Sequence, residues 1–273
     1  MPLMMRTSNR TLPVALTIAG SDSGGGAGIQ ADLKTFASLR VHGASAITCV
    51  TAQNPDGVIG IQACRPGIVR RQVEAVFGAM RPAAVKTGML YSAEIIGAIA
   101  PFFSRGKHPP LVVDPVMLST SGSRLLKPSA VARLTRELFS RALLVTPNLA
   151  EAQVLVQRRI TSVEAMRWAA KEIHGRFGCA ALVKGGHLKN SREAADIFFD
   201  GRDEWLLSSP FVQGMRTHGT GCTYSAAITA YLALGYELRE SVARAKEYVF
   251  RAIEQSDRAA GHDVLNSFWK GCR

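Results

Sequence analysis

The most constraining feature of this 273-residue sequence is a regular alternation between short apolar runs and longer helical patterns. The apolar runs are rich in β-branched residues and show no polar alternation, which is typical of strands covered on both faces. Strands that alternate with helices form right-handed βαβ units and therefore a mostly parallel sheet with helices on both sides. The expected strands are Val14–Ala19, Ser45–Thr51, Ala84–Lys86, Leu111–Asp114, Leu143–Thr146 and Ala180–Lys184.

The stretches between these runs show the apolar spacing of amphipathic helices. In residues 163–177, apolar side chains recur with 3-4-3-4 spacing, and the segment Thr161-Ser162-Val163-Glu164 fits a capping box at the start of a helix. The expected helices are Ala27–Arg40, Pro66–Met80, Ala93–Ser104, Pro128–Ser140, Pro147–Gln157 and Val163–Arg176.

The last third of the chain departs from this alternation. The short β-rich stretches Asp196–Phe199, Glu204–Leu207 and Phe211–Gln213 predict a meander at the sheet edge, and two helices are expected to follow it. No long Pro/Ser-rich linker, low-complexity tract or internal repeat divides the sequence. We therefore expect a single domain over residues 12–273, preceded by a flexible tail at residues 1–11.

The formal net charge of +12 raises the question of nucleic-acid binding. The basic residues are scattered, however, and the short clusters Arg70-Arg71 and Arg158-Arg159 have no aromatic residues among them for base stacking. A phosphate-rich small substrate, or a solvated basic surface, explains the charge at least as well. We therefore expect no nucleic-acid partner.

Cysteine usage and hydropathy predict a cytoplasmic protein. The five cysteines are odd in number and form no CxxC pair, which argues against a disulfide framework or a zinc site. Residues 1–10 lack an apolar signal core, and no apolar run approaches the roughly 20 residues that span a bilayer. We therefore expect no membrane partner.

Glycines and polar residues gather where the expected strands end, which is where ligands bind in sheets of this kind. The turn Gly20–Gly28 has neither the glycine spacing of a dinucleotide fingerprint nor the Lys-Ser/Thr pair of a P-loop. Within it, Asp22 either accepts a hydrogen bond from a substrate hydroxyl or caps the turn. Gln53 either pairs with the edge of a heterocycle or is solvated. Met89 either forms an apolar wall or packs in the core.

Later strand ends supply oxygen ligands and a cation. Asp114 closes one strand, and Pro147 is expected at the first helical position after the next strand, which places Asn148 and Glu151 on one face of that helix. These oxygen-bearing side chains suit Mg²⁺ bound through waters. Lys184 ends the following strand beside two glycines, where its charge can meet transferring phosphates.

A glycine-rich turn, His218-Gly219-Thr220-Gly221-Cys222, leads into an apolar helix. The unpaired N–H groups and positive dipole end of a helix start bind phosphates, and glycines allow a close approach. The same potential is expected to lower the thiol pKa of Cys222, which makes it a candidate base. The alternative is an ordinary loop–helix junction with a core cysteine. Together with the strand-end residues, this turn describes phosphoryl transfer from a magnesium–nucleotide.

These motifs together resemble a known family. The segments AGSDSGGGAGIQADLKTF, VTAQN, KTGML, DPVM, TPNLAEA, VKGGH and HGTGCT occur in order, as in the hydroxymethylpyrimidine/phosphomethylpyrimidine kinases of thiamine biosynthesis, in the ribokinase superfamily. The resemblance runs from about residue 14 to residue 260 and implies a ribokinase-like three-layer α/β/α fold with a central, mostly parallel sheet. It also implies that ATP, with Mg²⁺, phosphorylates the hydroxymethyl group of 4-amino-5-hydroxymethyl-2-methylpyrimidine and then the resulting monophosphate.

The resemblance implies a substrate pocket in which Gln53 hydrogen-bonds the aminopyrimidine. The residues implied to line this pocket are Gly20, Asp22, Met89 and Val116. We also expect the chain to form a homo-oligomer, a dimer.

The resemblance also implies a phosphate site. It places Mg²⁺ at Asp114 and Glu151, and the nucleotide phosphates at Asn148 and Lys184. The implied anion hole consists of Gly219, Thr220 and Gly221. Cys222 takes the place of the aspartate that serves as base in related sugar kinases. Because phosphoryl transfer passes through a loose transition state, positioning can replace early deprotonation, and both roles for Cys222 stay open.

Some features depart from the family pattern or leave alternatives. Ser23-Gly24 stands where the family commonly has Pro-Ser, so this loop is expected to be more flexible. Thr120 stands where many members have a lysine near the phosphates.

The nearest alternative function is that of a pyridoxal or pyridoxine kinase, and Gln53 favours the aminopyrimidine. An alternative from another class is a non-catalytic nucleotide- or pyrimidine-binding regulator, which the retained Lys184 and the glycine-rich helix start argue against.

Overall fold

The centre of the structure, a computed structural model, is a single sheet with the strand order β3-β2-β1-β4-β5-β6-β7-β8-β9. The strands β2, β1, β4, β5, β6 and β7 run parallel, and β3, β8 and β9 pair antiparallel at the edges. The structure describes residues 11–104, 108–117, 125–186, 188, 193–212 and 218–270. The expected tail at residues 1–11 therefore lies almost wholly outside the described residues.

The strands follow one another along the chain with helices between most of them. Their bounds are β1 Val14–Asp22, β2 His42–Asn54, β3 Gly57–Ala63, β4 Ala84–Thr87, β5 Leu111–Val113, β6 Leu144–Val145, β7 Ala180–Lys184, β8 Glu193–Phe199 and β9 Glu204–Pro210. A separate hairpin, β10 Asp257–Ala259 and β11 His262–Val264, follows the last helix.

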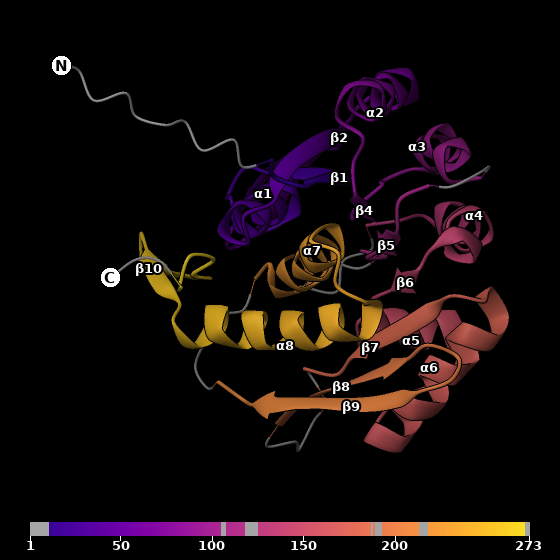
Figure 1. Cartoon of the computed structure of the whole chain (residues 1–273), viewed down its shortest axis with the longest axis vertical. Coiled ribbons are helices and arrows are strands. Elements are labelled where there is room, and N and C mark those ends of the chain that lie inside the picture. Colours follow the sequence, from indigo (N-terminus) through magenta and orange to yellow (C-terminus); the bar gives the residue numbers. More distant parts are fainter. Residues whose placement is uncertain are drawn as a thin grey trace.

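Helices cover both faces of the sheet and form a three-layer α/β/α arrangement (Figure 1). One apolar core lies between the sheet and α2 to α6, and a second lies between the opposite face and α1, α7 and α8. The helix bounds are α1 Gly28–Ser38, α2 Pro66–Met80, α3 Ala93–Ile99, α4 Pro128–Glu137, α5 Leu149–Val156, α6 Val163–Phe177, α7 Thr220–Ala233 and α8 Leu238–Glu254. The expected mostly parallel sheet flanked by helices is confirmed.

The edges of the sheet differ from expectation. The strand β3 was not expected, because its apolar residues Val58 and Ile59 are exposed and two glycines interrupt it. The expected meander is a hairpin of β8 and β9. Phe211 and Val212 follow β9 without forming a strand, so the expected strand Phe211–Gln213 is wrong at these positions, and Gln213 lies outside the described residues.

Helix capping differs from expectation at α5 and α6, although α6 begins at Val163 as expected. The helix α5 begins at Leu149 and not at Pro147, because Asn148 is the N-cap residue and exchanges hydrogen bonds with Glu151. At α6 the N-cap is Ser162, whose hydroxyl accepts a hydrogen bond from the backbone N–H of Ala165. The reciprocal capping box therefore stands at α5 rather than at α6.

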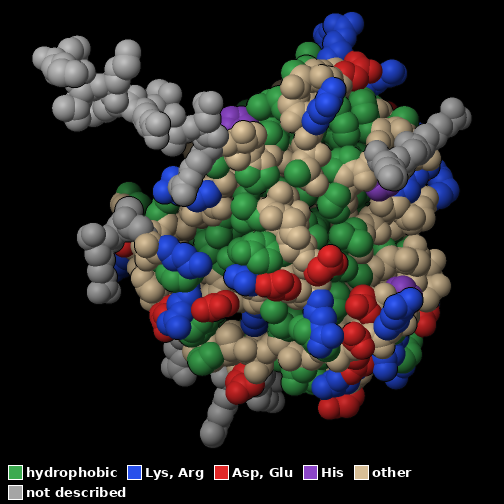
Figure 2. Space-filling view, viewed as in Figure 1, with side chains coloured by type: hydrophobic (Ala, Val, Ile, Leu, Met, Phe, Trp, Pro, Cys, Tyr) green, Lys and Arg blue, Asp and Glu red, His purple; other side chains and the backbone are tan. Residues whose placement is uncertain are grey.

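Charged side chains of both signs are interspersed on the face that α8 covers, as Figure 2 shows. On this face the net positive charge of the sequence is not gathered into one basic patch, which agrees with the scattering of lysines and arginines along the chain. Among the described residues, no helix is both long enough and apolar enough to cross a membrane.

A fully buried ion pair joins three elements beneath the carboxyl edge of the sheet. The Lys86 ammonium at the end of β4 lies 2.7 Å from Oδ1 of Asp32 in α1. The Thr17 hydroxyl of β1 donates to the other Asp32 oxygen at 2.6 Å. Because neither charged side chain is exposed to solvent, each depends on the other for compensation.

We predict that Asp32→Ala lowers the free energy of unfolding by about 3–5 kcal/mol, because it leaves the Lys86 charge buried and uncompensated. The matched control is Glu74→Ala, which breaks the exposed Arg70–Glu74 pair of α2 and is expected to cost at most about 1 kcal/mol. Urea unfolding of the two variants measures both costs. Equal losses of stability would contradict a structural role for the buried pair.

Candidate active site

The polar residues singled out in the sequence converge on one edge of the sheet. The parallel strands β1, β2, β4, β5, β6 and β7 all end there, so the loops that follow them lie side by side. The amino end of α7 reaches the same edge, because a backbone oxygen of the loop after β1 lies against Gly219. Two groups of side chains result, one around Gln53 and one around Lys184.

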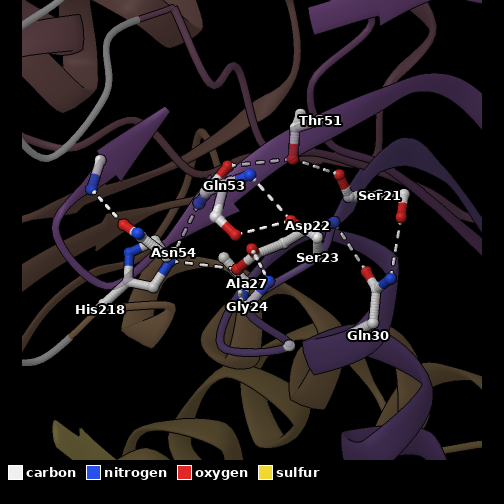
Figure 3. A network of polar contacts seen from close by, with 12 residues as sticks. Ser21, Asp22, Ser23, Gly24, Ala27, Gln30, Thr51, Gln53, Asn54 and His218 are labelled. Atoms are coloured by element: carbon white, nitrogen blue, oxygen red, sulfur yellow. Dashed lines mark hydrogen bonds and ion pairs between the residues drawn. The ribbon is translucent and has the colours of Figure 1, made fainter. Parts of the chain in front are cut away.

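The first group is a hydrogen-bond network built on the loop after β1 (Figure 3). The Asp22 carboxylate accepts hydrogen bonds from the backbone N–H groups of Gly24 and Ala27, both at 2.8 Å. Its Oδ2 atom also lies 3.2 Å from Nε2 of His218. Burial raises the pKa of Asp22, but the His218 contact and the two backbone donors outweigh burial and hold the pKa below its ordinary value. Asp22 therefore caps the turn as an ionised carboxylate.

Gln53 belongs to the same network. Its amide nitrogen lies 3.2 Å from Nε2 of His218, and its amide oxygen accepts a hydrogen bond from the Thr51 hydroxyl at 3.3 Å. The Ser23 hydroxyl accepts from the Gln53 backbone N–H and donates to the Gln53 carbonyl. The loop around Ser23-Gly24, expected to be more flexible, is thus tied to β2 in this structure. His218 joins Asp22 to Gln53, a role that its place in the HGTGCT motif did not reveal.

The two glycine-rich segments touch through their backbones. Gly219 has a φ of 85°, and a Cβ atom there would lie 1.7 Å from the carbonyl oxygen of Gly26. A Cβ atom on Gly26 would in turn lie 2.9 Å from the His218 ring. No side chain larger than hydrogen fits at either position without displacement, so these glycines set the distance between the loop after β1 and the start of α7.

Gly20 and Met89 face each other across the neighbouring strand ends. A Cβ atom on Gly20 would lie 3.1 Å from the terminal methyl group of Met89 and 2.7 Å from the sulfur of Cys49. Val116, just beyond β5, has a φ of 43°, which is strained for a β-branched residue. Among the described contacts, none joins Val116 to Gln53 or Met89.

The second group centres on Lys184 at the end of β7. Its ammonium lies 3.1 Å from Oδ1 of Asp114, and a Cβ atom on Gly221 would lie 3.2 Å from it. Burial lowers the pKa of Lys184, but the charges of Asp114 and Glu151 outweigh burial and raise it above its ordinary value. A permanent positive charge therefore stands beside the first turn of α7, where the backbone N–H groups lack intrahelical partners.

Asp114 is held by two hydroxyl groups besides its ion pair. The Thr146 hydroxyl lies 3.2 Å from Oδ1, and the Ser225 hydroxyl of α7 lies 3.1 Å from Oδ2. Ser225 was not singled out in the sequence, since a serine within an apolar helix gives no local sign of this contact. The carboxylate is almost wholly buried, so its position is fixed.

Glu151 and Asn148, expected to bind Mg²⁺ and the nucleotide phosphates, cap the start of α5 in this structure. One Glu151 oxygen accepts from the backbone N–H of Met117 and the other from that of Asn148, both at 2.9 Å. The Asn148 side-chain oxygen accepts from the backbone N–H of Glu151. Burial and the nearby Asp114 charge raise the pKa of Glu151 to about 7, against the opposing effects of Lys184 and the backbone donors.

Cys222 stands at the start of α7, but its acidity differs from expectation. Burial, with smaller contributions from the charges of Asp32 and Asp114, raises the pKa of the thiol to about 11 in spite of the nearby Lys86 charge. The expected lowering by the helix dipole is therefore wrong, because desolvation outweighs it. The thiol is protonated at neutral pH.

The part of the chain that the structure describes has no cluster of three or more His, Cys, Asp or Glu side chains that could hold a metal on its own. The carboxylates of Asp114 and Glu151 nevertheless both lie close enough to Lys184 to raise the pKa of its ammonium. This environment suits Mg²⁺, which is usually bound by one or two carboxylates together with waters and phosphates. Thr120 and His187 lie outside the described residues.

Comparisons with known proteins show the family to which the chain belongs. The phosphomethylpyrimidine kinase family model matches residues 22–266. A hydroxymethylpyrimidine/phosphomethylpyrimidine kinase of Rhizobium meliloti is 52% identical over 247 residues, which cover 90% of this chain and 92% of that protein. Phosphomethylpyrimidine kinase from Clostridium difficile has a solved structure with a TM-score of 0.78 and 43% identity, covering 88% of this chain and 99% of its own.

Pyridoxal kinases are similar in structure as well. An ADP complex of Bacillus subtilis pyridoxal kinase gives a TM-score of 0.87 at 35% identity and covers 94% of this chain and 98% of its own. These similarities confirm the expected ribokinase-like fold and the expectation of a kinase. On the match of the family model and the identity to its members, the chain belongs to the phosphomethylpyrimidine kinase family.

Proposed function

We propose that this kinase uses ATP to phosphorylate 4-amino-5-hydroxymethyl-2-methylpyrimidine and then its monophosphate, in the biosynthesis of thiamine diphosphate. The observation that carries the proposal is the Lys184 ammonium, held by Asp114 beside the glycine-rich start of α7. A fixed cation and the backbone N–H groups at a helix start together stabilise the charge of a transferring phosphoryl group. Family membership supports the pyrimidine substrate.

The phosphate groups bind at the start of α7 in this proposal. The backbone N–H groups of Gly219, Thr220 and Gly221 form the anion hole, and Lys184 contacts the nucleotide phosphates with help from Asn148. Asp114 and Glu151 hold Mg²⁺, mostly through waters since their oxygens already accept hydrogen bonds. When bound, Mg²⁺ neutralises phosphate charge and orients the nucleotide.

The pyrimidine binds on the other side of the Gly26–Gly219 contact. Gln53 pairs its amide with the aminopyrimidine, and the Thr51 and His218 contacts hold that amide in place. The remaining lining of the pocket is Gly20, Asp22, Met89 and Val116. The strained backbone of Val116 supports a place in the site, since such strain persists where function requires it.

A pyridoxal kinase is the second candidate, because a solved pyridoxal kinase matches 94% of this chain with a TM-score of 0.87. We predict turnover of the hydroxymethylpyrimidine and its monophosphate with a kcat/KM at least about tenfold above that of pyridoxal, the difference that the loss of one hydrogen bond of about 1.4 kcal/mol produces. Coupled kinetics with each substrate, ATP and Mg²⁺ measure this. Preference for pyridoxal would reassign the substrate, and no turnover of any substrate would favour a binding regulator.

Cys222 can accept a proton only as a thiolate, a form that its raised pKa makes rare but strongly basic. In the first reaction a hydroxyl must lose its proton, whereas in the second the nucleophile is already a phosphate oxygen. We predict that Cys222→Ala slows the first reaction by about a hundredfold and the second by much less. Single-turnover rates of both reactions test this, with Cys64→Ala, a free cysteine before α2, as the control. Equal losses in both reactions would count against a proton-transfer role.

We further propose that the chain forms a homodimer through the surface of β2, β3 and α2. Large apolar side chains are exposed there, with Ile59 81% exposed, Val50 51%, Ile68 49% and Val58 40%. Exposed apolar side chains at a sheet edge of this kind favour association with another chain. Sedimentation analysis should find a dimer that Ile59→Lys converts to monomer, whereas Leu206→Lys, at a comparably apolar site on the opposite edge strand, leaves it intact. A monomeric unsubstituted protein at micromolar concentration would refute the dimer.

A further inference from the structure

Asp196 is a buried carboxylate that the phosphoryl-transfer proposal does not use. It lies on β8, directly opposite Lys184 of β7 in the antiparallel register, and is 3% exposed. Its Oδ1 atom accepts a hydrogen bond from the backbone N–H of Gly185 at 2.9 Å. Asp196 therefore holds the residue that directly follows the phosphate-binding lysine.

Lys246 of α8 fixes the other side of this carboxylate. Its ammonium donates to Oδ2 of Asp196 at 2.8 Å and to the carbonyl oxygen of Ala194 at 2.7 Å. The helix α8 lies alongside β8 and β9 (Figure 1), and Lys246 reaches Asp196 from this helix. Both oxygens of Asp196 are thus occupied, which leaves the carboxylate a single orientation toward Gly185.

The backbone around Gly185 has little freedom. A Cβ atom there would lie 2.2 Å from the carbonyl oxygen of Ala195 and 2.5 Å from the terminal methyl group of Met166. The backbone N–H of Lys184 donates to the carbonyl oxygen of Pro147 at 2.9 Å. The backbone that carries the Lys184 side chain is therefore held on both sides. Pro147, between β6 and α5, holds Lys184 itself, and Asp196 holds Gly185.

We propose that Asp196, oriented by Lys246, is a positioning residue that holds Lys184 where it meets the nucleotide phosphates. This inference rests on the proposed role of Lys184. Its physical basis is that a displacement of about 1 Å in a charged group near the reacting atoms costs a large factor in rate or binding. Loss of the Gly185 bond frees the turn after Lys184, so its ammonium loses its fixed distance from the start of α7.

A matched pair of double variants isolates the bond to Gly185. Asp196→Asn with Lys246→Met removes both charges and keeps an acceptor for the Gly185 N–H, whereas Asp196→Leu with Lys246→Met removes the charges and the acceptor. Any stability lost with the ion pair is common to both variants, and thermal unfolding confirms that both are folded. The KM for ATP and the KM for the pyrimidine are then measured separately.

We expect the Leu-containing variant to raise the KM for ATP about tenfold above that of the Asn-containing variant, since one buried N–H loses its partner. The KM for the pyrimidine should agree within about twofold between the variants, because Gln53 lies in the other group of residues. Equal KM values for ATP in the two variants would overturn the inference and leave Asp196 with a purely structural role.

The variant Lys184→Met tests the proposed role of Lys184 separately from the proposed role of Asp196. If Lys184→Met raises the KM for ATP, the further change from Asn to Leu at position 196 should have little effect in that background, since both act through one side chain. An undiminished effect of position 196 in that background would overturn the inference. If Lys184→Met leaves the KM for ATP unchanged, the proposed phosphate contact of Lys184 fails, and the inference fails with it.

Discussion

The arrangement of this protein depends on how the charged side chains in its interior are paired. Among the described residues, lysine–aspartate pairs lie at or beneath the carboxyl edge of the sheet, namely Lys86–Asp32, Lys184–Asp114 and Lys246–Asp196. A charge removed from water is costly unless it is paired, so each pair constrains the elements that carry its two members. The pairs tie α1, α8 and the strand ends together, and they leave the Lys184 pair next to the glycine-rich start of α7. The position of the proposed anion site therefore follows from how the buried charges are paired.

The main architecture followed from the sequence because it depends on burial that repeats along the chain. Each central strand is apolar on both faces, and the helices between them carry one apolar stripe, so the periodicities alone predict a covered parallel sheet. The edges are less predictable. The strand β3 exposes Ile59 and Val58 instead of burying them, and α5 starts two residues late because Asn148 and Glu151 cap it. Both differences depend on local contacts that do not change the periodicity.

The candidate site was predictable as far as it depends on strand ends, and less so where partners come from distant parts of the chain. Asp114, Lys184 and Gly221 could be placed near one another because parallel strands end at one edge. The neighbours of Asp22 and Asp114, His218 and Ser225, could not, because more than a hundred residues separate each pair. The acidity of Cys222 was misjudged for the same reason, since desolvation depends on the whole surrounding fold and not on the turn itself.

The contact between Gly26 and Gly219 lies between the proposed pyrimidine pocket and the proposed phosphate site. It therefore separates the choice of substrate from the transfer of the phosphoryl group. Because this contact joins backbone to backbone, the spacing between the two proposed sites does not depend on the side chains that would surround the ring. In the proposed arrangement, residues such as Gln53 and Met89 can therefore differ between related kinases without changing how the phosphoryl group is transferred. Vitamin kinases with different ring preferences can accordingly inherit one transfer geometry, in line with the TM-score of 0.87 between this chain and a pyridoxal kinase. A change of substrate in such a scaffold then requires new side chains around the ring only. The distance between the bound ring and the phosphates stays the same.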